Sequence, residues 1–156
     1  MKIAIGSDHA GWDLKQRYKR ALESLGHVVV DVGTHAAAPP VDYPDFCFPV
    51  GELVARGEVD RGIVLGGSGI GEAIAANKVA GVRAAVVTSE ETARLARRHN
   101  DSNVMAVGGR TNPDLEAAVG WLHFWLETPF EGGRHEPRLR KIRAYEDRHS
   151  ATRPEP

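Results

Sequence analysis

Short apolar runs alternate along this chain with longer segments in which apolar residues recur at helical spacing. The apolar runs predict five strands, at residues 2–6, 27–32, 61–65, 83–88 and 103–107. The other patterns predict helices at residues 12–25, 44–56, 72–79, 89–98 and 112–126, the last two capped by Ser89 and Asn112-Pro113. Strands that alternate with helices through short turns are typical of a parallel sheet covered on both faces. The expected fold class is therefore α/β: a three-layer αβα sandwich with a Rossmann-like, five-stranded parallel sheet.

An extra helix is expected near the C-terminus, from residue 137 to about residue 148. Leu139, Ile142 and Tyr145 form a narrow apolar stripe on it, which could dock on the domain or on a second subunit. Residues 150–156 lack a core-forming pattern and are expected to form a disordered tail. We therefore expect a single domain at residues 1–149, which is long enough to bury a full core.

Composition excludes several classes of partner. The 20 Lys and Arg residues balance 21 Asp and Glu residues, so nothing supports binding to nucleic acid or to an anionic membrane. The chain has one cysteine, Cys47, which excludes an internal disulfide framework and fits a reducing compartment, so the cytoplasm is expected. No apolar run approaches the ~20 residues that span a bilayer, and no signal sequence precedes the first strand, so a soluble protein is expected.

The third strand runs into four glycines around one serine, and this segment offers the clearest chemistry. Its residues are Gly66, Gly67, Ser68, Gly69 and Gly71, and Glu72 follows them. Glycines allow close approach of a ligand, so successive backbone N–H groups can converge on an anionic oxygen. Glu72 adds a carboxylate beside that cradle, and a base next to anion-stabilising donors favours proton abstraction from carbon. The alternative is a tight strand-to-helix turn without function.

Neither common nucleotide motif fits this loop. The third glycine of Gly67-x-Gly69-x-Gly71 falls one position too early for a dinucleotide fingerprint. No Gly-Lys-Ser/Thr follows, so the loop is not a phosphate-binding P-loop either.

Two His-containing pairs are further candidates. Asp8 and His9 directly follow the first strand, at the same sheet edge as the glycine loop, although Asp8 could simply cap a helix while His9 sits in solvent. His99 and Asn100 end the helix after the fourth strand, where a histidine could merely complement the helix dipole. The seven histidines are scattered, and neither His-x-x-x-His nor Cys-x-x-Cys occurs, so no metal site is expected.

Arginines supply candidate phosphate contacts, because the guanidinium fork matches phosphate oxygens. Arg110 follows the fifth strand, and Arg134 and Arg138 flank the start of the last helix. For Arg134 and Arg138 the alternative is the solvated face of a charged helix. Cys47 is expected to be a small buried apolar residue.

The chain resembles the ribose-5-phosphate isomerase B family, which also includes allose-6-phosphate and galactose-6-phosphate isomerases. The resemblance runs from the first strand to about Tyr145. It rests on six blocks in order: GSDHAG at 6–11, DYP at 42–44, GGSGIGE at 66–72, AANK at 75–78, HND at 99–101 and EGGRH at 131–135.

The resemblance implies an aldose–ketose isomerase without metal or cofactor, which acts through an enediolate and works as a homodimer with shared active sites; a tetramer is the alternative assembly. Glu72 matches the base, Ser68 and the backbone of Gly67, Gly69 and Gly71 match the anion hole, and His99 matches the residue that opens the furanose ring. Asp8 matches a contact to the substrate oxygens. The positions that match substrate or phosphate contacts of the family are His9, Tyr43, Asn100, Arg110, Arg134 and Arg138.

One departure selects a branch of the family. Many members place a cysteine base at the position of Gly66, whereas others use a glutamate at the position of Glu72, and this chain fits the second group. The expected reaction is interconversion of D-ribose 5-phosphate and D-ribulose 5-phosphate, a step of the pentose phosphate pathway. Another phosphorylated sugar, such as a tetrose or hexose phosphate, remains an alternative, and so does a non-catalytic nucleotide- or phosphate-sensing module.

Overall fold

A single sheet of five parallel strands organises the chain in the computed structural model, which describes residues 1–112 and 114–150. The strands are β1 (Lys2–Ser7), β2 (Val28–Asp31), β3 (Arg61–Gly66), β4 (Ala84–Val86) and β5 (Val104–Gly108). Their order across the sheet is β2-β1-β3-β5-β4, and each neighbouring pair is parallel. The α/β fold class predicted from the sequence is thus confirmed.

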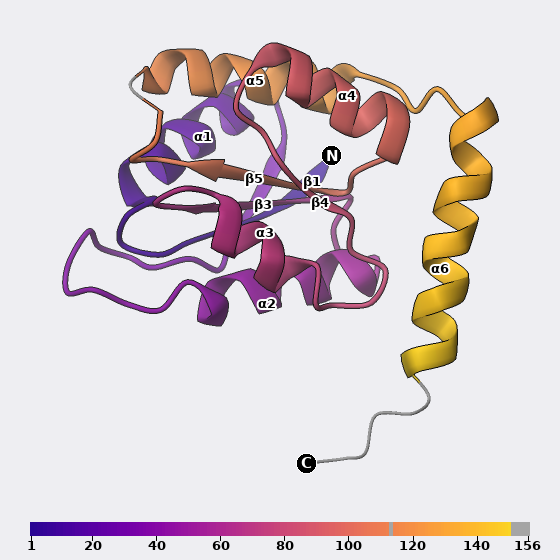
Figure 1. Ribbon diagram of the computed structural model, residues 1–156. Helices are drawn as coiled ribbons and strands as arrows, with labels where there is room; N and C mark the ends of the chain where they lie inside the picture. Colours follow the sequence, from indigo (N-terminus) through magenta and orange to yellow (C-terminus); the bar gives the residue numbers. More distant parts are fainter. Residues whose placement is uncertain (113, 151–156) are drawn as a thin grey trace.

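Five helices cover the two faces of the sheet (Figure 1). One layer contains α1 (Trp12–Ser24), α4 (Glu90–Asn100) and α5 (Leu115–Glu127), and the other contains α2 (Pro44–Ala55) and α3 (Ile70–Ala76). The strands alternate between the two cores: Ile63 and Leu65 face the first layer, and Val64 faces the second. This period-two pattern on strands that are buried on both faces explains their near-continuous apolar sequences.

The chain changes direction across the sheet between β1 and β3. From β1 it crosses outward to β2, and it then returns past β1 to β3 on the other side. Loops that leave two strands at such a switch point diverge to opposite faces, which opens a crevice at the carboxyl edge of the sheet. The loop after β1 and the glycine loop after β3 flank this point.

Several element boundaries differ from the predicted ones. Helix α3 occupies Ile70–Ala76 instead of residues 72–79, because the glycine loop needs only residues 67–69 to turn. Helix α5 is capped by Asp114, whose carboxylate accepts the N–H groups of Glu116 and Ala117, so the predicted cap at Asn112 is wrong. The other half of that predicted cap, Pro113, lies outside the described residues. Strand β4 has three residues instead of six.

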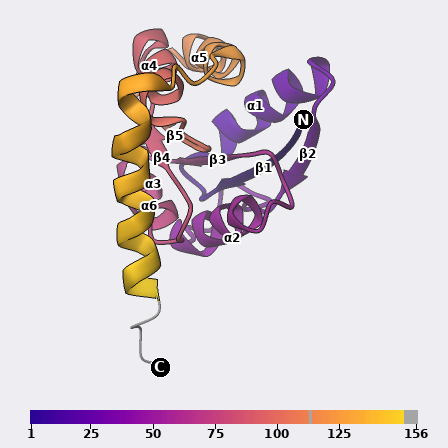
Figure 2. The ribbon, with the colours of Figure 1, turned by 90° about the vertical axis from the view of Figure 1, so that its right-hand side faces the viewer.

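The last helix, α6 (Glu136–Ser150), stands beside the body of the molecule after a short 3-10 turn, η1 (Gly133–His135). Figure 2 shows it as a rod alongside the helical layers and the sheet. Its apolar stripe is not packed into the chain, since Ile142 is 48% exposed and Tyr145 59% exposed. A cavity of about 610 Å³ is lined by α6 and by the loop that carries Gly81 and Arg83, although the N–H of Gly81 reaches Oε2 of Glu146 at 3.1 Å. The predicted tail began at residue 150, but Ser150 ends α6, and residues 151–156 lie outside the described part.

Within residues 1–112 and 114–150, no helix combines the length and apolar character that crossing a membrane requires.

Candidate active site

The glycine loop joins β3 to α3 at the centre of the sheet's carboxyl edge. Gly69 has a φ of 79°, and a Cβ on it would lie 3.0 Å from the amide nitrogen of Gly108 at the end of β5. The Oγ of Ser68 accepts a hydrogen bond from the N–H of Ile70 at 3.2 Å. Glycine is therefore required at position 69 both for the backbone conformation and for the close contact with β5.

Glu72 lies in the first turn of α3, and its carboxyl group folds back over Gly66. The residue is only 4% exposed, and its Oε2 has no hydrogen-bond partner among the residues that the structure describes. Burial raises the pKa of Glu72 above its ordinary value, and the negative charge of Asp8 adds to the rise. Backbone N–H groups of the loop and of Glu72 itself offset part of it. A buried carboxyl group whose pKa is raised holds a proton more readily, as a general base must.

Asp8 and His9 follow β1 beside this loop. One carboxylate oxygen of Asp8, Oδ1, accepts the N–H groups of Ala10 at 2.9 Å and Gly11 at 3.0 Å, which holds the turn before α1; the helix itself begins after Gly11 without a side-chain cap, so Asp8 is not its N-cap. His9 is half-buried, and its Nδ1 accepts the N–H of Val41 at 3.2 Å. His9 therefore fastens the long loop after β2 to the edge of the sheet, rather than lying free in solvent.

Tyr43 and Arg110 contact the glycine loop at its two ends, at Gly71 and Gly67. A Cβ on Gly71 would lie 2.8 Å from Cζ of Tyr43, so the phenol ring packs directly on the backbone there. The N–H of Arg110 donates to the carbonyl of Gly67 at 3.0 Å. The carboxyl edge thus gathers nine of the candidate residues: Asp8, His9, Tyr43, Gly67, Ser68, Gly69, Gly71, Glu72 and Arg110.

The other four candidates lie at the amino edge of the sheet. His99 and Asn100 end α4, which runs back against the strand direction, and Nε of Arg83, just before β4, donates to the carbonyl of Asn100 at 3.0 Å. Arg134 lies in η1 and Arg138 in the first turn of α6. The five residues of β5 alone span about 13 Å between the two edges at ~3.3 Å per residue. One chain therefore does not bring His99 and Glu72 together.

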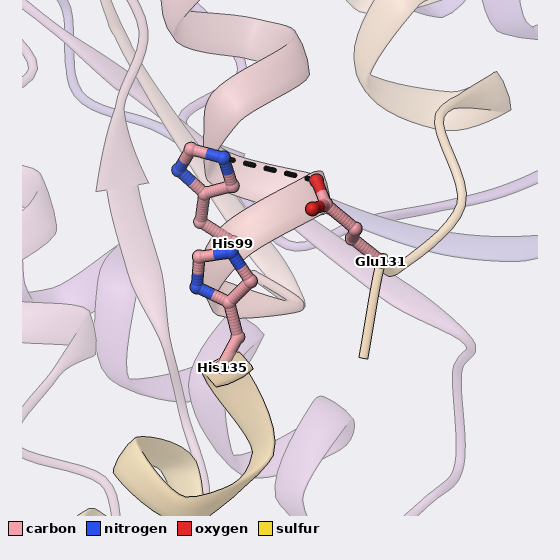
Figure 3. A group of neighbouring side chains, drawn as sticks. All are labelled: His99, Glu131 and His135. Carbon is pink, nitrogen blue, oxygen red and sulfur yellow. Dashed lines mark ion pairs between the residues drawn. The ribbon is translucent and has the colours of Figure 1, made fainter. Parts of the chain in front are cut away.

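His99 has a close neighbour that the sequence did not single out, His135 of η1 (Figure 3). The two imidazole rings stack with centroids 4.3 Å apart and planes 14° from parallel. His135 is buried, and its Nε2 has no hydrogen-bond partner in the described part of the chain. Its Nδ1 lies 3.4 Å from Nη1 of Arg138. Burial, and the nearby charges of His99 and Arg134, lower the pKa of His135, which favours a neutral ring for this stack.

His99, Glu131 and His135 also form a cluster that spacing along the chain does not reveal, with ligand atoms within 4.8 Å of one another. Two imidazoles and a carboxylate are a donor set that zinc accepts. However, nearly parallel stacked rings direct their lone pairs side by side instead of toward one point, and Oε2 of Glu131 is paired with Arg98 at 3.2 Å. In this arrangement the three side chains do not converge on one point.

The carboxyl edge defines the class of protein. An α/β sheet that carries a buried acid beside an amide-lined loop at its switch point is built to move protons on a small anionic substrate. The chain belongs to the Ribose/Galactose Isomerase family, whose sequence model matches residues 3–142.

Individual relatives match over nearly their whole length. Ribose-5-phosphate isomerase B of Escherichia coli is 45% identical over 147 residues, which cover 94% of this chain and 97% of the relative. The structure of ribose-5-phosphate isomerase B from Clostridium thermocellum superposes with a TM-score of 0.92 at 48% identity, over 96% of this chain and 99% of that chain. The enzyme from Mycoplasma genitalium, solved with bound ribulose-5-phosphate, has a TM-score of 0.90 at 41% identity, over 94% and 96% of the two chains.

Cys47 provides a test of the surroundings of Glu72. Cys47 is fully buried, and burial, with the charges of Glu72 and Asp8, raises the pKa of its thiol. Because only the thiolate reacts, we predict that iodoacetamide at neutral pH leaves Cys47 unmodified in the folded protein and alkylates it in denaturant. Mass spectrometry of the intact chain measures the adduct. Rapid, complete labelling of the folded protein would contradict this description.

Proposed function

We propose that this protein interconverts D-ribose 5-phosphate and D-ribulose 5-phosphate by metal-free proton transfer, with Glu72 as the base. The observation that carries the proposal is the buried carboxyl group of Glu72, whose Oε2 lacks a hydrogen-bond partner among the described residues and lies beside an amide-lined loop. The ribulose-5-phosphate complex of the Mycoplasma genitalium relative supports a five-carbon sugar phosphate as substrate.

The proposed chemistry follows from the charges at the carboxyl edge. Glu72 removes the proton from C2 of the open-chain aldose, and negative charge develops on the oxygen at C1. The backbone N–H groups of residues 67–71 and the hydroxyl of Ser68 hold that oxyanion. A proton then moves from the hydroxyl group at C2 to the oxygen at C1, so that the negative charge passes to the oxygen at C2. Glu72, whose proton exchanges with solvent, protonates C1, and the carbonyl group of the ketose forms at C2. Asp8 orients the hydroxyl groups of the sugar through Oδ2, because Oδ1 accepts the N–H groups of Ala10 and Gly11.

We further propose that two chains assemble each active site. The base and the anion-binding loop lie at one edge of the sheet, while the ring-opening candidate His99 and the phosphate-binding candidates Arg134 and Arg138 lie at the other. A two-fold homodimer can place the amino edge of one chain against the carboxyl edge of the next. The exposed stripe of α6, with Ile142 and Tyr145, gives such a dimer an apolar contact.

A nucleotide-sensing role is less well supported. In dinucleotide-binding folds, an acidic residue about 20 residues after the glycine motif, close to the end of the second strand, binds the ribose hydroxyl groups. Counted from the glycine loop of this chain, that position falls at Glu90 and Glu91, in the first turn of α4. Both residues are exposed, and Oε1 of Glu90 is paired with Arg94 at 2.9 Å. Another phosphorylated sugar stays the second candidate, since the loop of Val41 and Tyr43 borders the site. A cytoplasmic location is proposed on the single, reduced, buried thiol.

The first test replaces the base. Glu72→Gln keeps the shape of the side chain and removes its proton affinity, so kcat should fall at least ~100-fold while KM changes little. Ketose formation from ribose 5-phosphate measures both constants. Glu91→Gln, an exposed position in the first turn of α4, serves as the control and should keep full activity. If the Glu72 variant turned over at a normal rate, the assignment of the base would be wrong.

The second test concerns the phosphate. Arg134→Ala or Arg138→Ala should weaken competitive inhibition by inorganic phosphate by roughly 1.5–3 kcal/mol, the scale of a charge-assisted hydrogen bond. Arg148→Ala, at an exposed position far along α6, should leave that inhibition unchanged. Unchanged inhibition constants in both site variants would remove the two arginines from the phosphate site.

The third test asks whether the site is shared. A mixed dimer of Glu72→Gln with His99→Asn, or with Arg134→Ala, has one site with both lesions and one site with none. Random pairing makes about half of the dimers mixed, so about a quarter of the sites should recover under two-fold symmetry. Equimolar pairs are unfolded, refolded and assayed against each variant refolded alone. With mixed dimers shown to form, the absence of recovery in both pairs would contradict sharing.

A further inference from the structure

Gly66 occupies an unusual position with respect to the proposed base. A Cβ built on Gly66 would lie 1.6 Å from Oε1, 2.3 Å from Cδ and 2.9 Å from Cγ of Glu72, and these are its three nearest neighbours. Real Cβ atoms do not approach other heavy atoms this closely. The carboxyl group of Glu72 therefore fills the space that any side chain at position 66 would need.

The backbone of Gly66 is held from both sides and does not have room to retreat. Its carbonyl accepts the N–H of Gly109 at 2.7 Å, and its register partner in β5 is Gly108. On the other side Gly11 packs so closely that a Cβ there would lie 2.7 Å from the nitrogen of Gly66. Gly66 itself does not have a positive φ, so alanine would meet no backbone strain there. The expected effect of a side chain at position 66 is therefore to displace the carboxyl group of Glu72.

The alternative positions of the carboxyl group are less favourable for catalysis. Tyr43 packs on the backbone of Gly71, next to Glu72, and Asp8 faces the carboxyl group with a like charge. From α2, the buried thiol of Cys47 lies within the electrostatic field of Glu72. We therefore expect a carboxyl group displaced from this space to move outward, toward the solvent side of the edge. A displaced Glu72 would then lose both its burial and its place beside the loop amides.

We propose that Gly66 is a positioning residue for the base, and that its missing side chain forms the seat in which the carboxyl group of Glu72 is held and desolvated. This inference rests on the proposed function, since it takes Glu72 to be the base. It adds a requirement that the base assignment alone does not make: the reaction depends on the absence of a side chain at position 66, although glycine supplies no side chain that could act on the substrate.

The experiment compares Gly66→Ala with Gly120→Ala, a helical position in α5 where a Cβ meets nothing within 4 Å among the described residues. Moving a catalytic group by about 1 Å can lower the rate ~100-fold, so kcat of Gly66→Ala should fall by that order while KM stays within about three-fold. The acid limb of the pH profile of kcat/KM should also move to lower pH, because a carboxyl group released into solvent regains its ordinary, lower pKa. Gly120→Ala should match the wild type in both respects.

A merely structural role would not produce this pH shift, and a folding defect is detected separately by circular dichroism. Carbon-13 NMR of labelled glutamate, with the Glu72 signal assigned from its loss in Glu72→Gln, follows the titration without any turnover. In folded Gly66→Ala that signal should titrate at lower pH than in the wild type. An unchanged titration, together with an unchanged kcat, would overturn the proposal for Gly66 while leaving Glu72 as the base.

The shorter acid provides a second variant pair. Glu72→Asp withdraws the carboxyl group from the space above position 66, so its effect on kcat should be at least ~10-fold smaller in the Gly66→Ala background than in the wild type. Independent, multiplicative effects of the two substitutions on kcat would contradict the proposal that Gly66 provides the space for the carboxyl group of Glu72. If Glu72→Gln proved fully active, the proposed function would fail instead, and the two failures are therefore distinguishable.

Discussion

The common direction of the five strands is the constraint on which the rest of this structure depends. Every loop that follows a strand emerges at one edge of the sheet, and every helix that returns must end at the other edge. Asp8, Ser68 and Glu72 follow strands, whereas His99 ends a helix. Candidate residues that the motifs group together are therefore separated by the length of the strands within one chain, and this separation is the basis of the proposal that a second chain completes the site.

The same sheet also explains how an acid can be kept buried. Glycines at the ends of β3 and β5, among them Gly66 and Gly108, let the strand ends and the loop approach closely enough to exclude water from Glu72. Burial of an isolated carboxylate is unfavourable. For Glu72 the consequence is a raised pKa, and no salt bridge compensates its burial among the described residues. Asp31 shows the opposite solution, since Lys15 and Lys19 neutralise it and lower its pKa despite its partial burial. Under the proposed function, the raised pKa suits Glu72 to proton transfer, whereas Asp31 is held in ion pairs with Lys15 and Lys19.

The sequence predicts the fold class well because apolar periodicity and glycine positions are local signals. It also predicts the glycine loop and the carboxylate beside it. Boundaries such as the start of α5 were missed because the cap at Asp114 competes with an equally suitable Asn112. The contact between His99 and His135, and the overlap of Gly66 with Glu72, depend on residues that the fold brings close from separate elements. Periodicity carries no information about such contacts, and neither does it show that the candidates divide between two edges.

The central claim is that a carboxylate moves a proton between carbons through an enediolate, and hydrogen exchange with solvent measures this directly. The protein is incubated with ribose 5-phosphate in deuterium oxide for many turnovers, and proton NMR follows the signals of C1 in the ketose and C2 in the aldose. A base that exchanges its proton with solvent predicts deuterium at both carbons. Formation of ribulose 5-phosphate with no deuterium at either carbon after many turnovers would contradict transfer through a base that exchanges its proton with solvent.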